Sequence, residues 1–110
     1  MTQIHYGHLL DFSGGGDNDN DELFTTSDIS SCDAFMLMSS AGAVDVLVSL
    51  DGVNFSTAPL SLQDFGAVDT TPVLVTAAGR VYGFAGKFRK IRALQNGATA
   101  AQATLIAWKL

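Results

Sequence analysis

The acidic loop near the N-terminus carries the first pattern that could do chemistry. Asp17, Asp19 and Asp21 have the spacing of the first three ligands of a calcium-binding loop, and Asp28 falls at the twelfth position, where a bidentate carboxylate belongs. The sixth position holds Glu22 instead of the glycine that makes the sharp turn of such loops. The pattern favours a solvated linker and leaves a low-affinity Ca²⁺ site as the alternative. That alternative predicts a large shift in melting temperature when Ca²⁺ or a chelator is added.

Two histidines close to the N-terminus raise a zinc hypothesis. His5, His8 and Asp11 recur at a spacing of three, which would align them on one side of a helical turn, and histidine with carboxylate suits zinc. Gly7 and the glycines that follow disfavour a helix, and a terminal segment preorganises ligands poorly. We therefore interpret both side chains as neutral surface or interface histidines, and we expect no metal and no cofactor.

Nucleophilic catalysis has few candidate residues. Cys32 is the one cysteine, and it has no basic partner nearby in sequence, so an internal disulfide and a cysteine-rich zinc site are both excluded. The sequence contains neither a Gly-x-Ser-x-Gly motif nor a Walker motif. Two carboxylates can still converge in space, as glycoside hydrolysis requires, but the chain is small for a catalytic cleft. We expect a protein that is not an enzyme.

The segment 86–94 carries the most specific signal. It contains four basic residues interleaved with apolar ones, namely Lys87, Arg89, Lys90 and Arg92. On a strand the first two would share one face and the last two the other, which implies a bulge or a contact on both faces. Two interpretations are open. The cations either pair with acids of neighbouring strands, or they form an interface with a protein partner, for which the planar guanidinium group is well suited.

The charge of the whole chain narrows the kind of partner. The 110 residues carry a net charge of −5, and every acidic residue lies between Asp11 and Asp69, whereas every basic residue lies between Arg80 and Lys109. This excludes a generic nucleic-acid binder, which needs a net basic footprint. No stretch approaches the roughly 20 apolar residues of a membrane span, and the N-terminus lacks the pattern of a signal peptide. We therefore expect synthesis in the cytoplasm and no membrane partner.

The chain has the length of one domain and divides into two parts. Residues 1–32 hold an N-terminal arm and a Gly/Asx-rich loop over 14–22, in which glycine, asparagine and aspartate oppose both helix and strand. Residues 33–110 consist of short apolar runs separated by turn residues, which is typical of a β-sandwich domain.

Alternation identifies the clearest strand. Val44, Val46, Val48 and Leu50 alternate with other residues, and a period of two places all four on one face of a sheet. The other predicted strands cover 34–39, 58–63, 73–77, 80–85, 87–95 and 101–108, and 4–10 would add an eighth. Glycine turns are predicted at Gly42, Gly52, Gly79 and Gly97. We predict an all-β fold, an antiparallel β-sandwich or jelly roll of seven or eight strands with an N-terminal arm.

The second half of the chain resembles small β-sandwich structural proteins of tailed bacteriophages. Three stretches carry the resemblance: VLVSLDGVNF at 46–55, GRVYGF at 79–84 and FRKIR at 88–92. In these proteins a strand ends in a turn of the form SxDGxNW/F, and a later strand reads like FRKIRV. Phe55 stands here where Trp is common, and the resemblance covers residues 44–108.

The resemblance implies a head decoration, or cement, protein on the capsid surface of the virion. It implies a homotrimer that binds the major capsid protein and stabilises the shell. The residues expected to contact this partner are Lys87, Arg89, Lys90 and Arg92, together with His5, Tyr6 and His8 of the arm. The alternative is a carbohydrate- or receptor-binding module of a tail fibre or baseplate, which predicts exposed aromatic rings beside a groove lined with Asn, Asp or Gln.

Overall fold

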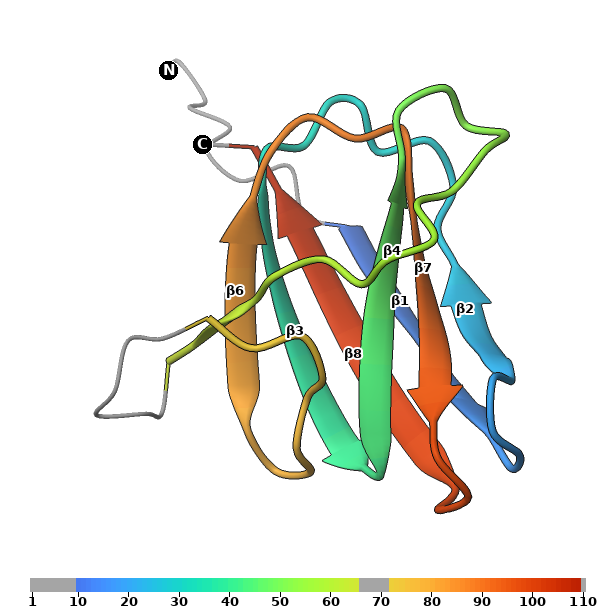
Figure 1. The fold of residues 1–110 in the computed structure, drawn as a ribbon. Coiled ribbons are helices and arrows are strands. Elements are labelled where there is room, and N and C mark those ends of the chain that lie inside the picture. The colour runs from blue at the N-terminus through green and yellow to red at the C-terminus, as the bar shows by residue number, and fades with distance from the viewer. Residues whose placement is uncertain (1–9, 66–71, 110) are drawn as a thin grey trace.

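The computed structural model describes residues 10–65 and 72–109, which form two packed antiparallel sheets (Figure 1). The larger sheet has the strand order β1-β8-β3-β6-β5, and the smaller sheet has the order β2-β7-β4. The strands are β1 (Leu10–Gly16), β2 (Glu22–Thr25), β3 (Ala34–Ala41), β4 (Ala43–Ser49), β5 (Gln63–Asp64), β6 (Val81–Ala85), β7 (Lys90–Asn96) and β8 (Ala101–Trp108). The predicted all-β sandwich is confirmed. Within these two ranges no helix is long and apolar enough to cross a membrane.

The pairing of the strands is nested. β1 pairs with β8, β2 with β7 and β3 with β6, so the first half of the chain lies against the second half in reverse order. The segment 56–60 flanks β4 in the same way, because the amides of Ser56 and Leu60 donate to the carbonyls of Val48 and Val46 at 2.8 and 2.7 Å. A long hairpin rolled over on itself in this manner is a jelly roll.

The core lies between the two sheets and follows from alternation along the strands. In β8 every second residue is buried, and three of the four inward side chains are alanines. The four inward residues are Ala101, Ala103, Leu105 and Ala107. Small side chains let β8 contact all three strands of the smaller sheet. Aromatic rings fill the space nearer β6, where Phe35 stacks on Phe84 with centroids 5.1 Å apart and Phe88 lies 5.8 Å from Phe35.

Most predicted strands are present with small shifts at their ends. The strand predicted over 34–39 extends to Ala41 as β3, the one over 80–85 is β6, and the one over 101–108 is β8. The strand predicted over 87–95 begins only at Lys90, and its pairing with β4 runs without a bulge. Lys87 and Arg89 precede the strand, so they do not share a face of it. The pairing of β7 with β2 has one register shift, which lies in β2 between Glu22 and Phe24 and not in the basic segment.

The strands predicted over 58–63 and 73–77 are largely wrong. Only β5 is a strand there, and Leu62 and Val73 add a single isolated bridge. Pro59 has no N–H to donate to a ladder, so the chain instead passes beside β4 as an irregular segment with few backbone hydrogen bonds.

The glycine run that composition assigns to a flexible loop ends a strand instead. Residues 14–16 belong to β1 and pair in register with β8. A β-carbon added at Gly14 would overlap the carbonyl oxygen of Leu23 in β2. Glycine is required here because two backbones approach closely at this edge of the sandwich. The described residues of the segment 1–32 thus supply β1 and β2, while the strand suggested for 4–10 lies outside the described residues except for Leu10.

The predicted glycine turns are confirmed. Backbone φ is +68° at Gly42, +82° at Gly52, +79° at Gly79 and +100° at Gly97. The position of Gly42 is the most demanding, because this one residue carries the chain from β3 in one sheet to β4 in the other.

Buried polar side chains take the place of backbone partners where the ladders are interrupted. Gln95 is fully buried, and it accepts a hydrogen bond from the amide of Ala101 at 3.1 Å and donates one to the carbonyl of Gly97 at 2.9 Å. The hydroxyl of Thr26 accepts from the amide of Ile91 at 3.0 Å. Across the described residues no buried side-chain nitrogen or oxygen lacks a partner. These bonds fix the β7–β8 turn and the path that leaves β2.

The close approach of β1 to β2 makes a prediction about stability. The substitution Gly14→Ala should destabilise the fold by about 2 kcal/mol or more, because the added methyl group can fit only if a backbone moves. Ser13→Ala, exposed on the same strand, is the matched control and should change stability by no more than about 0.5 kcal/mol. Urea unfolding measures both, and equal stabilities would contradict the close approach.

Candidate functional site

Three connections meet at one end of the sandwich, the upper end in Figure 1. They are the segments 26–33 between β2 and β3, 50–56 after β4, and 86–89 between β6 and β7. The amide of Ile29 donates to the carbonyl of Arg89 at 2.8 Å, and the amide of Arg89 donates to the carbonyl of Ser49, also at 2.8 Å. We call these three segments the loop end.

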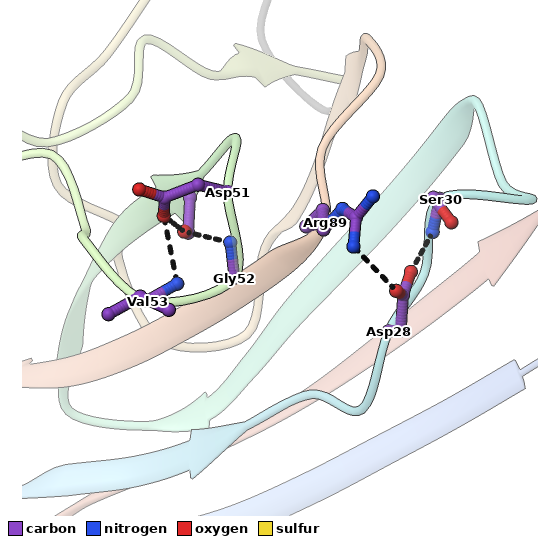
Figure 2. A network of polar contacts seen from close by, with 7 residues as sticks. Asp28, Ser30, Asp51, Gly52, Val53 and Arg89 are labelled. Carbon is purple, nitrogen blue, oxygen red and sulfur yellow. Dashed lines mark hydrogen bonds and ion pairs between the residues drawn. The ribbon is translucent and has the colours of Figure 1, made fainter.

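The carboxylate of Asp51 holds the segment after β4 in a tight turn (Figure 2). It accepts hydrogen bonds from the backbone amides of Val53 and Asn54 at 2.8 and 2.7 Å, and one from the side chain of Asn54 at 2.8 Å. These donors, led by the Asn54 amide, hold the pKa of Asp51 well below its ordinary value. Gly52 donates its amide to the hydroxyl of Ser49 at 2.9 Å and completes the turn.

The Asp51 turn holds two aliphatic side chains out in water. Leu50 is 73% exposed and Val53 is 78% exposed. Alternation along 44–50 predicts Leu50 on the same sheet face as Val44 and Val46, which are buried, and this is wrong because β4 ends at Ser49. The Asp-Gly pair that follows Leu50 marks a turn, and it was the signal that could have identified an exposed tip. A groove of about 500 Å³ runs beside the turn, and the residues that line it include Leu50, Asn54, Phe55 and Phe88.

Two of the four cations predicted to bind a partner belong to the loop end. Lys87 Nζ lies 3.6 Å from Asp33 Oδ2. Arg89 Nη1 lies 3.7 Å from Asp28 Oδ2, the pair drawn in Figure 2. Hydrogen bonds from the side chain and amide of Ser30, and then the charge of Arg89, lower the pKa of Asp28. Both ion pairs are long and exposed to solvent, so they hold the cations only weakly.

The other two cations lie on the outer face of the smaller sheet, where β7 leaves the loop end. Lys90 and Arg92 share this face, as predicted. Arg92 Nε lies 3.0 Å from Glu22 Oε1, and its guanidinium carbon lies 4.0 Å above the centroid of the Phe55 ring. Pairing with acids of neighbouring segments therefore occurs for three of the four cations. Their contact with a partner stays a prediction.

The acidic residues of the Gly/Asx loop are used by the turns of the fold. One carboxylate oxygen of Asp21 accepts from the amides of Asp17 and Asn18 at 3.1 and 3.0 Å, which lowers its pKa. The carboxylate of Asp19 accepts from the amide of Gly97 at 2.7 Å. In the part of the chain that the structure describes, no three His, Cys, Asp or Glu side chains gather as metal ligands.

The N-terminal arm residues that were predicted to contact a partner lie outside the described residues. His5, Tyr6 and His8 lie before the first described residue, and so do both histidines of the zinc hypothesis. Cys32 is fully buried and unbonded to another cysteine.

Comparison with known proteins identifies the fold but no family. No protein-family model matches the sequence, and no curated protein matches it either. The crystal structure of the SPBc2 prophage-derived protein YomS superposes with a TM-score of 0.71 at 8% identity, covering 97% of this chain and 99% of YomS. That of the PBSX exported protein XepA gives a TM-score of 0.69 at 12% identity, covering 97% of this chain but 40% of XepA. The chain thus shares its fold with a prophage-derived protein over nearly the full length of both.

The Asp51 turn predicts a local effect of one substitution. Asp51→Ala removes the acceptor of two backbone amides, so hydrogen exchange at Val53 and Asn54 should accelerate roughly tenfold. Because the pKa of Asp51 is lower in the folded chain, protection is present above the unfolded pKa of about 3.9 and is lost as pH falls through the lower folded pKa. Asp11→Ala, on the exposed side of β1, is the control and should leave both amides unchanged.

Proposed function

We propose that the chain is a structural protein of a tailed-phage particle, a decoration protein that binds the major capsid protein on the surface of the shell. The observation that carries the proposal is the loop end, where the fixed Asp51 turn exposes Leu50 and Val53 beside Lys87 and Arg89. A protein that only binds its partner needs a preorganised contact surface of this kind and needs no catalytic residues.

The loop end has the anatomy of a protein contact. Its two aliphatic side chains can insert into an apolar pocket of a partner, and a turn already fixed by hydrogen bonds loses little conformational entropy on binding. Around them the ion pairs of Lys87 and Arg89 are long and exposed, so either cation can turn toward a carboxylate of the partner.

Two further observations support a particle protein. The resemblance of residues 44–108 to β-sandwich phage proteins includes the Asp51 turn and the basic segment, which supply two of the three segments of the loop end. The fold shared with a prophage-derived protein agrees with that resemblance. The proposal also includes a homotrimeric state and contacts from His5, Tyr6 and His8 to the major capsid protein.

The groove beside the Asp51 turn favours the alternative, a carbohydrate- or receptor-binding module, because it combines two phenylalanine rings with Asp and Asn side chains. These groups are already engaged, however. The side-chain amide of Asn54 donates to Asp51 at 2.8 Å, and the guanidinium group of Arg92 covers a face of the Phe55 ring. The groove thus has few free groups for a sugar, and saturable glycan binding by the purified chain would favour this alternative.

The proposed function is tested on shells assembled from the major capsid protein alone. Replacing the exposed tip by Leu50→Ser with Val53→Ser should lower occupancy of the shell at least about tenfold, because the aliphatic contact is lost. Reversing the charge by Arg89→Glu and Arg92→Glu should also lower it. Co-sedimentation of protein with shells measures occupancy.

The matched control is Leu74→Ser, which replaces a 52% exposed leucine between β5 and β6, outside the loop end. It should leave occupancy unchanged. Melting temperatures of all variants show whether the fold is intact. If folded variants of the loop end decorate the shells as well as the control does, the loop end is not the capsid contact.

A further inference from the structure

The outer face of the larger sheet carries almost no charge. Alternation along β1, β8, β3 and β6 turns every second side chain away from the core. Among the outward residues of these strands, all of which are described, Asp11 on the edge strand β1 is the charged one. For a chain with a net charge of −5, this face is therefore unusual.

The side of this face away from β1 is also apolar. Met36 lies opposite Ile106 of β8, and Met38 lies opposite Val81 of β6, so these side chains form adjoining pairs across the strands. Phe65 lies over β6. Met38 is 43% exposed, Ile106 36% and Phe65 58%, and grooves of about 290 and 340 Å³ separate the side chains. We name the following six side chains the apolar face: Met36, Met38, Phe65, Val81, Ile106 and Trp108.

We propose that the apolar face binds a second copy of this chain, with the two larger sheets packed face to face. Contiguous exposed apolar surface on a soluble protein marks a contact. Methionine and aromatic residues are enriched, and charged residues depleted, at the centre of protein interfaces. Both descriptions fit this face, which differs from the loop end in having no ring of charges around its apolar side chains.

Size supports a second copy as the occupant. The three strands β8, β3 and β6, spaced about 4.8 Å apart with five to eight residues each at about 3.3 Å per residue, give an apolar face roughly 15 Å by 25 Å, and β1 widens the sheet to about 20 Å. Side chains enlarge its accessible area toward the about 800 Å² that each partner contributes to a stable interface. Two sheets can pack face to face in this way at the usual spacing of about 10 Å.

Charge supports the same occupant. Two copies with a net charge of −5 each repel one another wherever their acidic turns meet. The apolar face is the part of the described surface where they can approach without bringing those acids together. A basic partner would gain nothing from this face and would instead favour the acidic turns.

This inference does not depend on the loop end as capsid contact, and its experiment needs no capsid. A face-to-face pair is a twofold contact, so it is separate from the threefold contact of the proposed homotrimer. The full-length chain is studied by sedimentation equilibrium over a range of concentrations. We expect a reversible oligomer, whose dissociation constant rises at least about a hundredfold in Met38→Lys and in Ile106→Lys, because each places an unpaired charge in the contact.

The control variant is Leu74→Lys, which adds the same charge to an exposed leucine away from the apolar face, and it should assemble like the unmodified chain. The one tryptophan, Trp108, gives a second measurement. Its fluorescence should shift to longer wavelength on dilution and in Met38→Lys, at the concentration where the mass falls.

A dimer, or a larger oligomer that both lysine variants dissociate, supports the inference. A chain that stays monomeric at every concentration overturns it, as does an oligomer that forms unchanged in folded Met38→Lys. Weaker decoration of shells by Met38→Lys together with a monomeric unmodified chain would assign the face to the capsid protein, and it would equally overturn the inference.

Discussion

The position of β8 between β1 and β3 is the constraint on which the rest of the structure depends. β8 pairs along its length with both neighbours, and its small inward side chains let the smaller sheet approach. This approach at the edge of the sandwich brings the backbone of β2 so close to Gly14 that no side chain fits between them. Because β8 lies beside β1, the strands between them pair in reverse order. The loop end is therefore assembled from segments that lie far apart in the sequence.

The nested pairing explains why acidic and basic residues are segregated along the chain. Each ion pair of the described residues joins an acid from the first part to a base from the second: Asp64 to Arg80, Asp33 to Lys87, Asp28 to Arg89 and Glu22 to Arg92. As the basic residue of each pair moves toward the C-terminus, its acidic partner moves toward the N-terminus. A rolled hairpin produces this order, because its two halves lie side by side in opposite directions. Segregation in sequence thus becomes complementarity in space, and acids cannot find a basic partner within their own half.

The sequence predicted those features that depend on local pattern. Alternation of valines identified β4, and glycines with positive φ identified the turns, because both follow from the geometry of a few neighbouring residues. Glycines 14–16 were misjudged because their role depends on Leu23, which reaches them only through the tertiary fold. The same holds for the basic segment. Its residues were found as a cluster, but only the fold shows that Lys87 and Arg89 precede the strand and that each has an acid beside it.

The apolar face and the loop end differ in how far the sequence could predict them. Trp108 follows the fully buried Ala107 on a regular strand and therefore turns outward. Composition alone cannot give this result, because the direction of an aromatic side chain in a strand depends on register. Register depends in turn on the pairing of β8 with β1 and β3. The apolar face is thus set by the same strand that fixes the fold, whereas the loop end is set by the local hydrogen bonds of Asp51. A substitution that weakens one surface can therefore leave the other intact, and this separation allows their partners to be distinguished.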